Sequence, residues 1–150
     1  MDKNLKLEPG QGIGLVRFGM SEAEVIAACG PADKAYTDDT VRHLVYFEKR
    51  LDLWFDTESH HRLEWVSCAH PDIELEGARV IGSSGEDALR MVQKCLPEQD
   101  VELTDYGSFE SHMFEESWIE LQIEFGQVRS VSWGHFFDIE DKPVWPKRTN

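Results

Sequence analysis

The sequence predicts an α+β fold built from two tandem repeats, each a helix followed by an antiparallel meander. Together the repeats are expected to form a sheet with the helices on one face. Residues 19–26 (GMSEAEVI) recur as residues 82–89 (GSSGEDAL), an offset of 63, and residues 66–70 (VSCAH) recur as residues 131–135 (VSWGH), an offset of 65. Between these matches, the pattern FE followed by an alternating apolar segment also occurs twice. Ordered matches at nearly constant spacing indicate two copies of one supersecondary unit.

The repeats divide the chain into four parts within one compact domain. We expect a flexible N-terminus at 1–12, a first repeat at 13–76, a second repeat at 77–138 and an irregular tail at 139–150. Within the repeats, strands are predicted where apolar and polar residues alternate with a period of two. These segments are 41–47, 51–56 and 62–68 in the first repeat, and 101–106, 109–115, 118–125 and 128–136 in the second.

Capping residues predict where the two helices begin and end. Ser21 with Glu24 three residues later has the pattern of a capping box, and Gly30 followed by proline ends the first helix. Ser84 with Asp87 is expected to cap the second helix, over about residues 86–96. Each helix therefore comes directly before the strands of its own repeat.

Composition and charge exclude several classes of function. The 150 residues are 41% hydrophobic, enough for a core of their own, and no apolar run approaches the roughly 20 residues that cross a bilayer. The N-terminus has no apolar signal region, and the three cysteines form no C-x-x-C pair, so we expect a cytoplasmic protein with reduced, buried thiols. The net charge of −14 argues against nucleic-acid binding, which needs clustered Lys and Arg.

Acidic residues concentrate in one stretch of the second repeat. Between Lys94 and Arg129 there is no lysine or arginine, but there are nine acids. One interpretation is a solvated surface that keeps the protein soluble. The other is a docking surface for a basic partner.

One motif resembles a known family. Phe18-Gly-Met-Ser, followed by Val25 and then by Gly30-Pro31, is similar to the motif of the small outer-membrane-assembly lipoproteins of the SmpA/BamE type. The same helix-plus-meander unit, used twice, resembles the architecture of the secreted β-lactamase inhibitory protein. The resemblance implies a surface that grips another protein through an open sheet face and its loops. The chain departs from both families, because it has neither an acylated N-terminal cysteine nor cysteines for two disulfides.

Catalytic and cofactor motifs are absent from the sequence. It contains no P-loop, no G-x-S-x-G, no H-E-x-x-H and no cysteine-based zinc pattern. His60 and His61, near Asp56 and Glu58, could hold a metal loosely, but a polar hairpin tip is the favoured interpretation. We therefore expect no catalytic residues, no metal and no cofactor, and predict that the protein is not an enzyme.

The phase of two strands predicts a binding face. Leu51, Leu53 and Phe55 alternate with polar or aromatic neighbours, and the segment 118–125 repeats this alternation. One interpretation is that a second layer or the long tail covers the tryptophans opposite the aliphatic stripe. The other is that they anchor a partner within an acidic surround, an arrangement typical of binding hot spots. The predicted partner-binding residues are Asp52, Trp54, Asp56, Glu116, Trp118, Glu120 and Glu124.

These features predict a non-enzymatic acidic protein-binding module. Within that class we favour an immunity or inhibitor protein that neutralises a basic bacterial toxin, such as a nuclease, because opposite charges steer the two proteins together. A general intracellular adaptor or scaffold domain is the first alternative. An enzyme on an unusual fold is the second.

Overall fold

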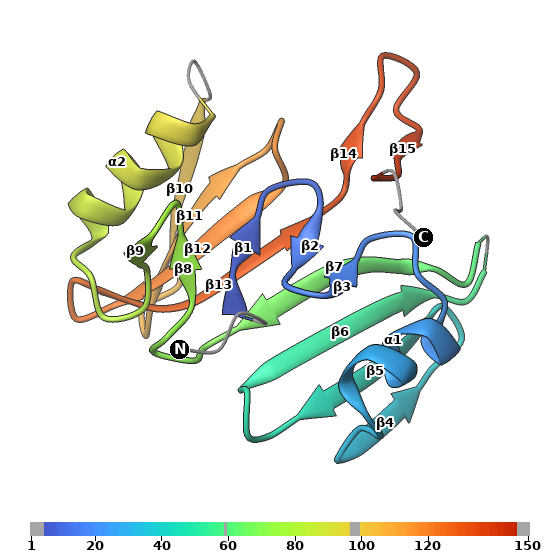
Figure 1. Ribbon diagram of the computed structural model, residues 1–150. Helices are drawn as coiled ribbons and strands as arrows, with labels where there is room; N and C mark the ends of the chain where they lie inside the picture. Colours follow the sequence, from blue (N-terminus) through green and yellow to red (C-terminus); the bar gives the residue numbers. More distant parts are fainter. Residues whose placement is uncertain (1–4, 59, 97–99, 147–150) are drawn as a thin grey trace.

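A large antiparallel sheet organises the chain in the computed structural model, which describes residues 5–58, 60–96 and 100–146 (Figure 1). Its eight strands follow the order β10-β11-β12-β13-β7-β6-β5-β4. In chain order they are β4 (Lys34–Thr37), β5 (Val41–Tyr46), β6 (Leu51–Asp56), β7 (Leu63–Cys68), β10 (Val101–Asp105), β11 (Glu110–Phe114), β12 (Ile119–Glu124) and β13 (Gln127–Gly134). The two halves of the sheet join where β13 pairs with β7, with Val131 opposite Cys68 and Trp133 opposite Val66.

Short elements surround this sheet. A three-stranded sheet contains β1 (Leu7–Glu8), β2 (Gly12–Ile13) and β3 (Val16–Arg17); β8 (Glu74–Leu75) pairs with β9 (Ala78–Arg79), and β14 (Phe136–Phe137) pairs with β15 (Pro143–Val144). The helices are α1 (Glu22–Cys29) and α2 (Gly85–Cys95). Neither helix in the described part of the chain is long and apolar enough to cross a membrane.

The predicted α+β class with two helix-plus-meander repeats is wrong. Strands account for 46% of the structure and helices for 14%, so the protein is mostly β, with one continuous eight-stranded sheet as its centre. The prediction gave too much weight to two well-capped helices and missed strands of two residues, which are too short to show a period. It also included no strand at β4, because all four residues of this edge strand are exposed and show no alternation.

Local capping follows the sequence closely. The Ser21 hydroxyl accepts a hydrogen bond from the Glu24 backbone N–H at 3.2 Å, and the Ser21 N–H donates to the Glu24 carboxylate at 3.1 Å, which confirms the capping box. At α2, the Ser84 hydroxyl accepts from the Asp87 N–H at 3.1 Å. Pro97, expected to end this helix, lies outside the described residues.

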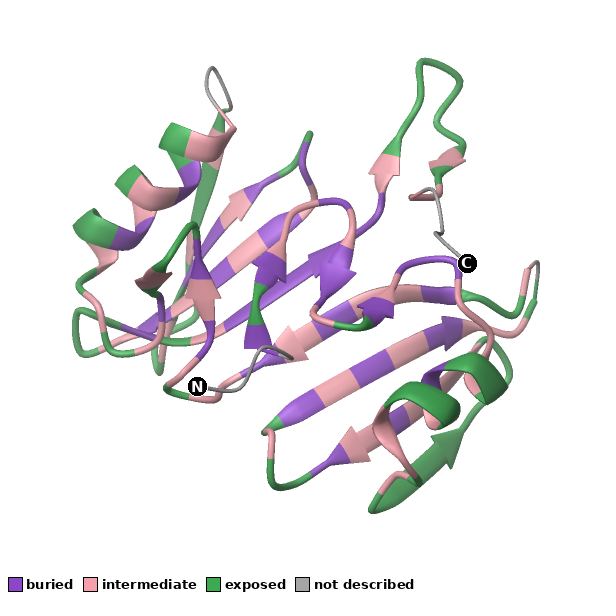
Figure 2. Ribbon diagram, viewed as in Figure 1, coloured by how far each residue is buried: buried purple, intermediate pink, exposed green. Residues whose placement is uncertain are grey.

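The core lies on one side of the sheet. Figure 2 shows buried and half-buried residues alternating along β6, where Leu51, Leu53 and Phe55 are buried. The helices and the three-stranded sheet lie over this side (Figure 1) and add Val25 and Val92, among others, to one continuous apolar cluster. Neither described helix lies over the opposite side of the sheet (Figure 1), where Asp52 and Trp54 are half-buried.

All three cysteines are free thiols, as expected, but their burial differs. Cys68 is buried on β7, and burial raises the pKa of its thiol to about 11. Cys29 and Cys95, at the ends of the helices, are only half-buried.

Candidate functional site

A band of aromatic rings crosses the open side of the sheet. Register places Tyr36 opposite His43, His43 opposite Trp54, and Trp54 opposite Trp65 on four neighbouring strands. Directly opposed residues share a face, so their rings lie in one row. The His43 and Trp54 rings stack with centroids 4.4 Å apart, and the Trp65 and Trp118 centroids are 4.7 Å apart.

Trp118 joins this band from a turn and not from a strand. The predicted strand began at residue 118, but β12 begins at Ile119, and Trp118 has a φ of 54°. Its carbonyl accepts a hydrogen bond from the Gly134 N–H at 3.0 Å, and its ring lies over that glycine. A Cβ atom on Gly134 would overlap the ring, so the absence of a side chain there lets Trp118 lie against the sheet beside Trp65.

The C-terminal segment covers one end of the band. The Phe137 ring lies 5.0 Å from Trp118, and Trp145 lies 4.9 Å from His135 and 5.0 Å from His60. The tail therefore covers the tryptophans only in part, and Trp54, Trp65 and Trp118 are half-buried.

A hollow of about 320 Å³ opens within the band. Its lining consists of Val41, Trp54, Glu64, Trp65 and Trp118. Glu64 and Trp65 share this face because the β6–β7 register shifts between Trp54 and Phe55, which leaves Glu64 as an extra residue in β7. The hollow thus combines three indole rings with a single carboxyl group.

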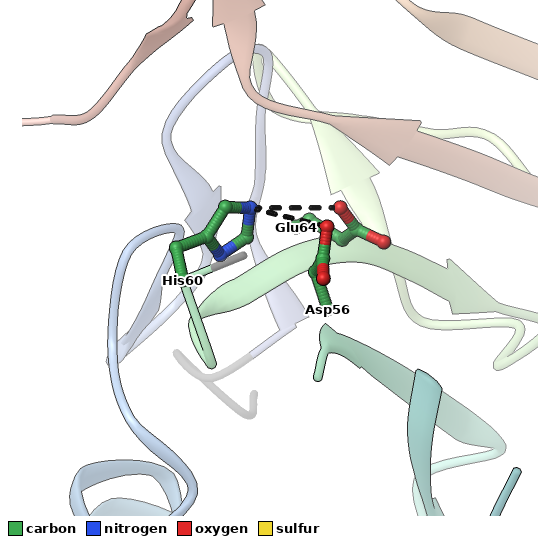
Figure 3. A group of neighbouring side chains, drawn as sticks. All are labelled: Asp56, His60 and Glu64. Carbon is green, nitrogen blue, oxygen red and sulfur yellow. Dashed lines mark ion pairs between the residues drawn. The ribbon is translucent and has the colours of Figure 1, made fainter. Parts of the chain in front are cut away.

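The carboxyl group of Glu64 also belongs to a second cluster, shown in Figure 3. His60 Nε2 lies 3.7 Å from Asp56 Oδ2 and 3.8 Å from Glu64 Oε2, so the ring points between the two carboxylates. Burial, followed by the charge of Asp56, raises the pKa of Glu64 to about 7. Burial lowers the pKa of His60, which favours its neutral form.

Three such ligand atoms within 4.8 Å of one another have the spacing of a metal site. The hydrogen bonding of His60 argues against that role. The Arg62 N–H donates to His60 Nδ1 at 3.1 Å, so the neutral ring carries its proton on Nε2, the atom that faces the carboxylates. A metal would need a lone pair at that atom, so we interpret the cluster as a histidine between two carboxylates and not as a metal site. His61 and Glu58 are not part of it.

The structure brings together only some of the residues predicted for binding. Asp52, Trp54, Asp56 and Trp118 lie on or beside the aromatic band, and the Asp52 carboxylate is 3.1 Å from His43 Nε2. Glu120 lies further along the same face, where it accepts a hydrogen bond from the Ser111 hydroxyl at 2.6 Å.

Two predicted residues lie apart from the band. Glu116 is exposed in the turn before β12. Glu124 is at the far end of β12, 3.8 Å from Arg129.

Sequence reasoning missed Tyr36, His43, Glu64 and Trp65. Strict alternation in β7 would have placed Glu64 and Trp65 on opposite faces, so the bulge concealed their shared position. Trp65 could have been found from the sequence, because it is a tryptophan on the predicted strand next to that of Trp54. Tyr36 belongs to an edge strand that has no periodic pattern.

The pKa of Glu64 leads to a pH-dependent prediction for Glu64→Gln. Because the folded-state pKa lies above the ordinary value of 4.5, the native protein binds more protons than the unfolded chain between about pH 4.5 and 7, and stability falls as pH rises through that window. Glutamine removes the cost of the buried charge. We expect the variant to be about 2 kcal/mol more stable than the wild type at pH 8 and nearly equal to it at pH 4.5.

Urea unfolding at both pH values measures this difference. Glu86→Gln, which changes a largely exposed carboxylate on α2, is the matched control and should show little pH-dependent gain. An equal effect of Glu64→Gln at both pH values would contradict the assignment of a buried, protonated carboxyl.

Comparison with solved structures finds bacterial proteins of similar fold at low sequence identity. A cysteine-rich secretory protein from Staphylococcus aureus matches with a TM-score of 0.51 and 14% identity over 89% of this chain and 48% of that chain. A DUF4309 family protein from Bacillus subtilis matches with a TM-score of 0.50 and 14% identity, covering 84% of this chain and 88% of that one. At this identity the likeness concerns the fold alone.

A further match is an extracellular protein containing a SCP domain from Bacillus anthracis, with a TM-score of 0.49, 12% identity, and coverage of 88% of this chain and 50% of that chain. The chain thus spans about half the length of two of these structures. No family model matches the chain, and a search of the curated proteins finds no match.

Proposed function

We propose that the open side of the sheet binds a basic protein and that the chain acts without catalysis. The observation that carries this proposal is the half-buried row of Trp54, Trp65 and Trp118 beside the carboxyl groups of Asp52 and Glu64. The apolar area that tryptophans leave in water costs free energy, and protein interfaces use tryptophans as anchors within a polar rim. The net charge of −14 adds long-range attraction for a basic partner.

Within this class, we propose an immunity or inhibitor protein that works in the cytoplasm against a basic bacterial toxin. A nuclease is a suitable target, because its substrate-binding cleft carries positive charge that an acidic surface complements. The SmpA/BamE-like motif at Phe18-Gly-Met-Ser supports protein binding only by resemblance. An adaptor domain would use the same face for a different basic protein.

Co-expression tests the immunity role. Any basic toxin domain encoded beside the gene of this protein is induced in a host cell with or without this chain, and growth is measured. We expect the wild type to restore growth, and the double variant Trp54→Ala/Trp118→Ala to restore much less at equal soluble expression. Phe125→Ala, at a residue that is 94% exposed in the β12–β13 turn, is the aromatic control and should behave as wild type.

Two results would contradict the immunity role: no growth rescue by the wild type, or no toxin domain encoded nearby. Rescue by wild type and double variant alike would place the interface on another surface.

A further inference from the structure

We propose that the hollow between Trp54, Trp65 and Trp118 receives the guanidinium group of an arginine side chain from the protein partner, which pairs with the Glu64 carboxylate. This inference rests on the proposed function and names the contact at its centre. It assigns a specific contact to one arginine of the partner, in addition to the long-range attraction between an acidic face and a basic protein.

The walls of the hollow suit a flat cation. Trp is the aromatic side chain with the strongest cation–π attraction, which acts within about 6 Å of the ring. The Trp65 and Trp118 rings are tilted by 48° to each other at 4.7 Å, so they form two inclined walls. Trp54 forms the third, and its ring is held in place by the stacked His43 ring at an angle of 15°.

The charge in the hollow also favours a cation. Glu64 is a half-buried carboxyl whose side chain is 22% exposed, and the neighbouring Asp56 carboxylate adds a like charge. Burial lowers the pKa of His60, which faces both acids; the Asp56 charge opposes this shift, and Arg62 and His61 add to it. The Arg62 guanidinium itself lies over the Trp145 ring, at 5.6 Å. A guest cation would supply the positive charge that stabilises ionised Glu64.

Arginine satisfies these conditions better than lysine. Its guanidinium is planar, can stack on an indole and can form two parallel hydrogen bonds with one carboxylate. It is also less strongly hydrated than an ammonium group, so entering a half-buried hollow costs less. A neutral side chain of the same shape would fill the hollow but leave the carboxylate unpaired.

The test titrates N-acetyl-arginine methylamide into the full chain labelled with ¹⁵N at its five tryptophans. At pH 8, we expect the indole signals of Trp54, Trp65 and Trp118 to shift with one saturable curve, while buried Trp133 does not. The citrulline analogue, which is nearly isosteric and uncharged, should bind at least fivefold more weakly, and the lysine analogue should also bind more weakly than arginine. Lowering the pH to 5.5 should weaken arginine binding by a similar factor, because Glu64 is then protonated.

Two variants test whether Glu64 is the carboxylate that pairs with the arginine. Glu64→Gln should reduce arginine affinity at pH 8 to the level of the citrulline analogue and remove the pH dependence, whereas Glu86→Gln should change neither. Equal binding of the arginine and citrulline probes overturns the proposal. So does the lack of any saturable shift at about 0.1 M probe, since a Kd of that size represents only about 1.4 kcal/mol.

The outcomes also separate this inference from the proposed function. If the arginine probe binds and no basic protein does, the function fails and the arginine site stands. If a basic protein binds through the tryptophans and the probe does not, the arginine site fails and the function stands.

Discussion

Trp133→Ala is expected to lower the free energy of unfolding by about 3–5 kcal/mol, the largest effect of any single change considered. The Trp133 side chain is fully buried on β13, at the junction of the two halves of the sheet. Its indole N–H donates to the Gly12 carbonyl at 3.1 Å and so connects the large sheet to the three-stranded one. Alanine would leave a cavity and remove this hydrogen bond.

Urea unfolding followed by circular dichroism measures this loss, and two variants divide it into parts. Trp133→Phe keeps most of the apolar contact and loses the hydrogen bond, so we expect a smaller loss, of about 1–3 kcal/mol. Phe125→Ala, at an exposed turn residue, should change stability by less than about 0.5 kcal/mol. A loss under about 1 kcal/mol for Trp133→Ala would mean that this residue is not packed between the two sheets.

Trp118→Ala is expected to weaken binding of the basic partner by about 2–4 kcal/mol, mainly through faster dissociation. Its ring completes the hollow beside Trp65 and covers Gly134, so truncation removes a wall and uncovers backbone. Surface plasmon resonance with the partner immobilised gives the two rate constants separately. Phe125→Ala should leave both unchanged. Unchanged dissociation for Trp118→Ala in a folded protein would exclude the aromatic band as the interface.

The acidic residues of the same face should mainly affect the association rate. Asp52→Asn combined with Glu120→Gln is expected to slow association and to reduce its dependence on salt. The reason is that salt screens charge attraction, with a Debye length of roughly 8 Å at 0.15 M. Both replacements keep a hydrogen-bond acceptor for His43 and Ser111. Glu86→Gln with Asp87→Asn changes the net charge equally at exposed positions of α2, over the other side of the sheet, and should have a smaller effect on association.

The helix caps and the β6 alternation could be predicted because their causes are local. The Ser21 hydroxyl can reach the backbone N–H three residues later, independently of the rest of the chain. In β6, the residues between Leu51, Leu53 and Phe55 must point to the opposite face of the strand. The same logic identified Trp54 and Asp52 as residues of the open face.

The errors came from positions where distant contacts decide. Leu7 looked like part of a flexible terminus, yet β1 pairs with β2 and buries this residue in the core. Trp118 was assigned to the alternating strand, but it lies in a turn, where Gly134 of another strand makes room for its ring. Glu64 was passed over because a bulge changes the phase of β7.

The sequence by itself determined where helices are capped, which strand residues are apolar, and that the molecule is acidic. Only the tertiary structure decided that β7 and β13 join two groups of strands into one sheet and that Trp65 and Glu64 lie beside Trp54 and Trp118. The physical reason is range. Caps and alternation act over three or four neighbouring residues, whereas the hollow depends on the register of strands that lie about sixty residues apart in the chain.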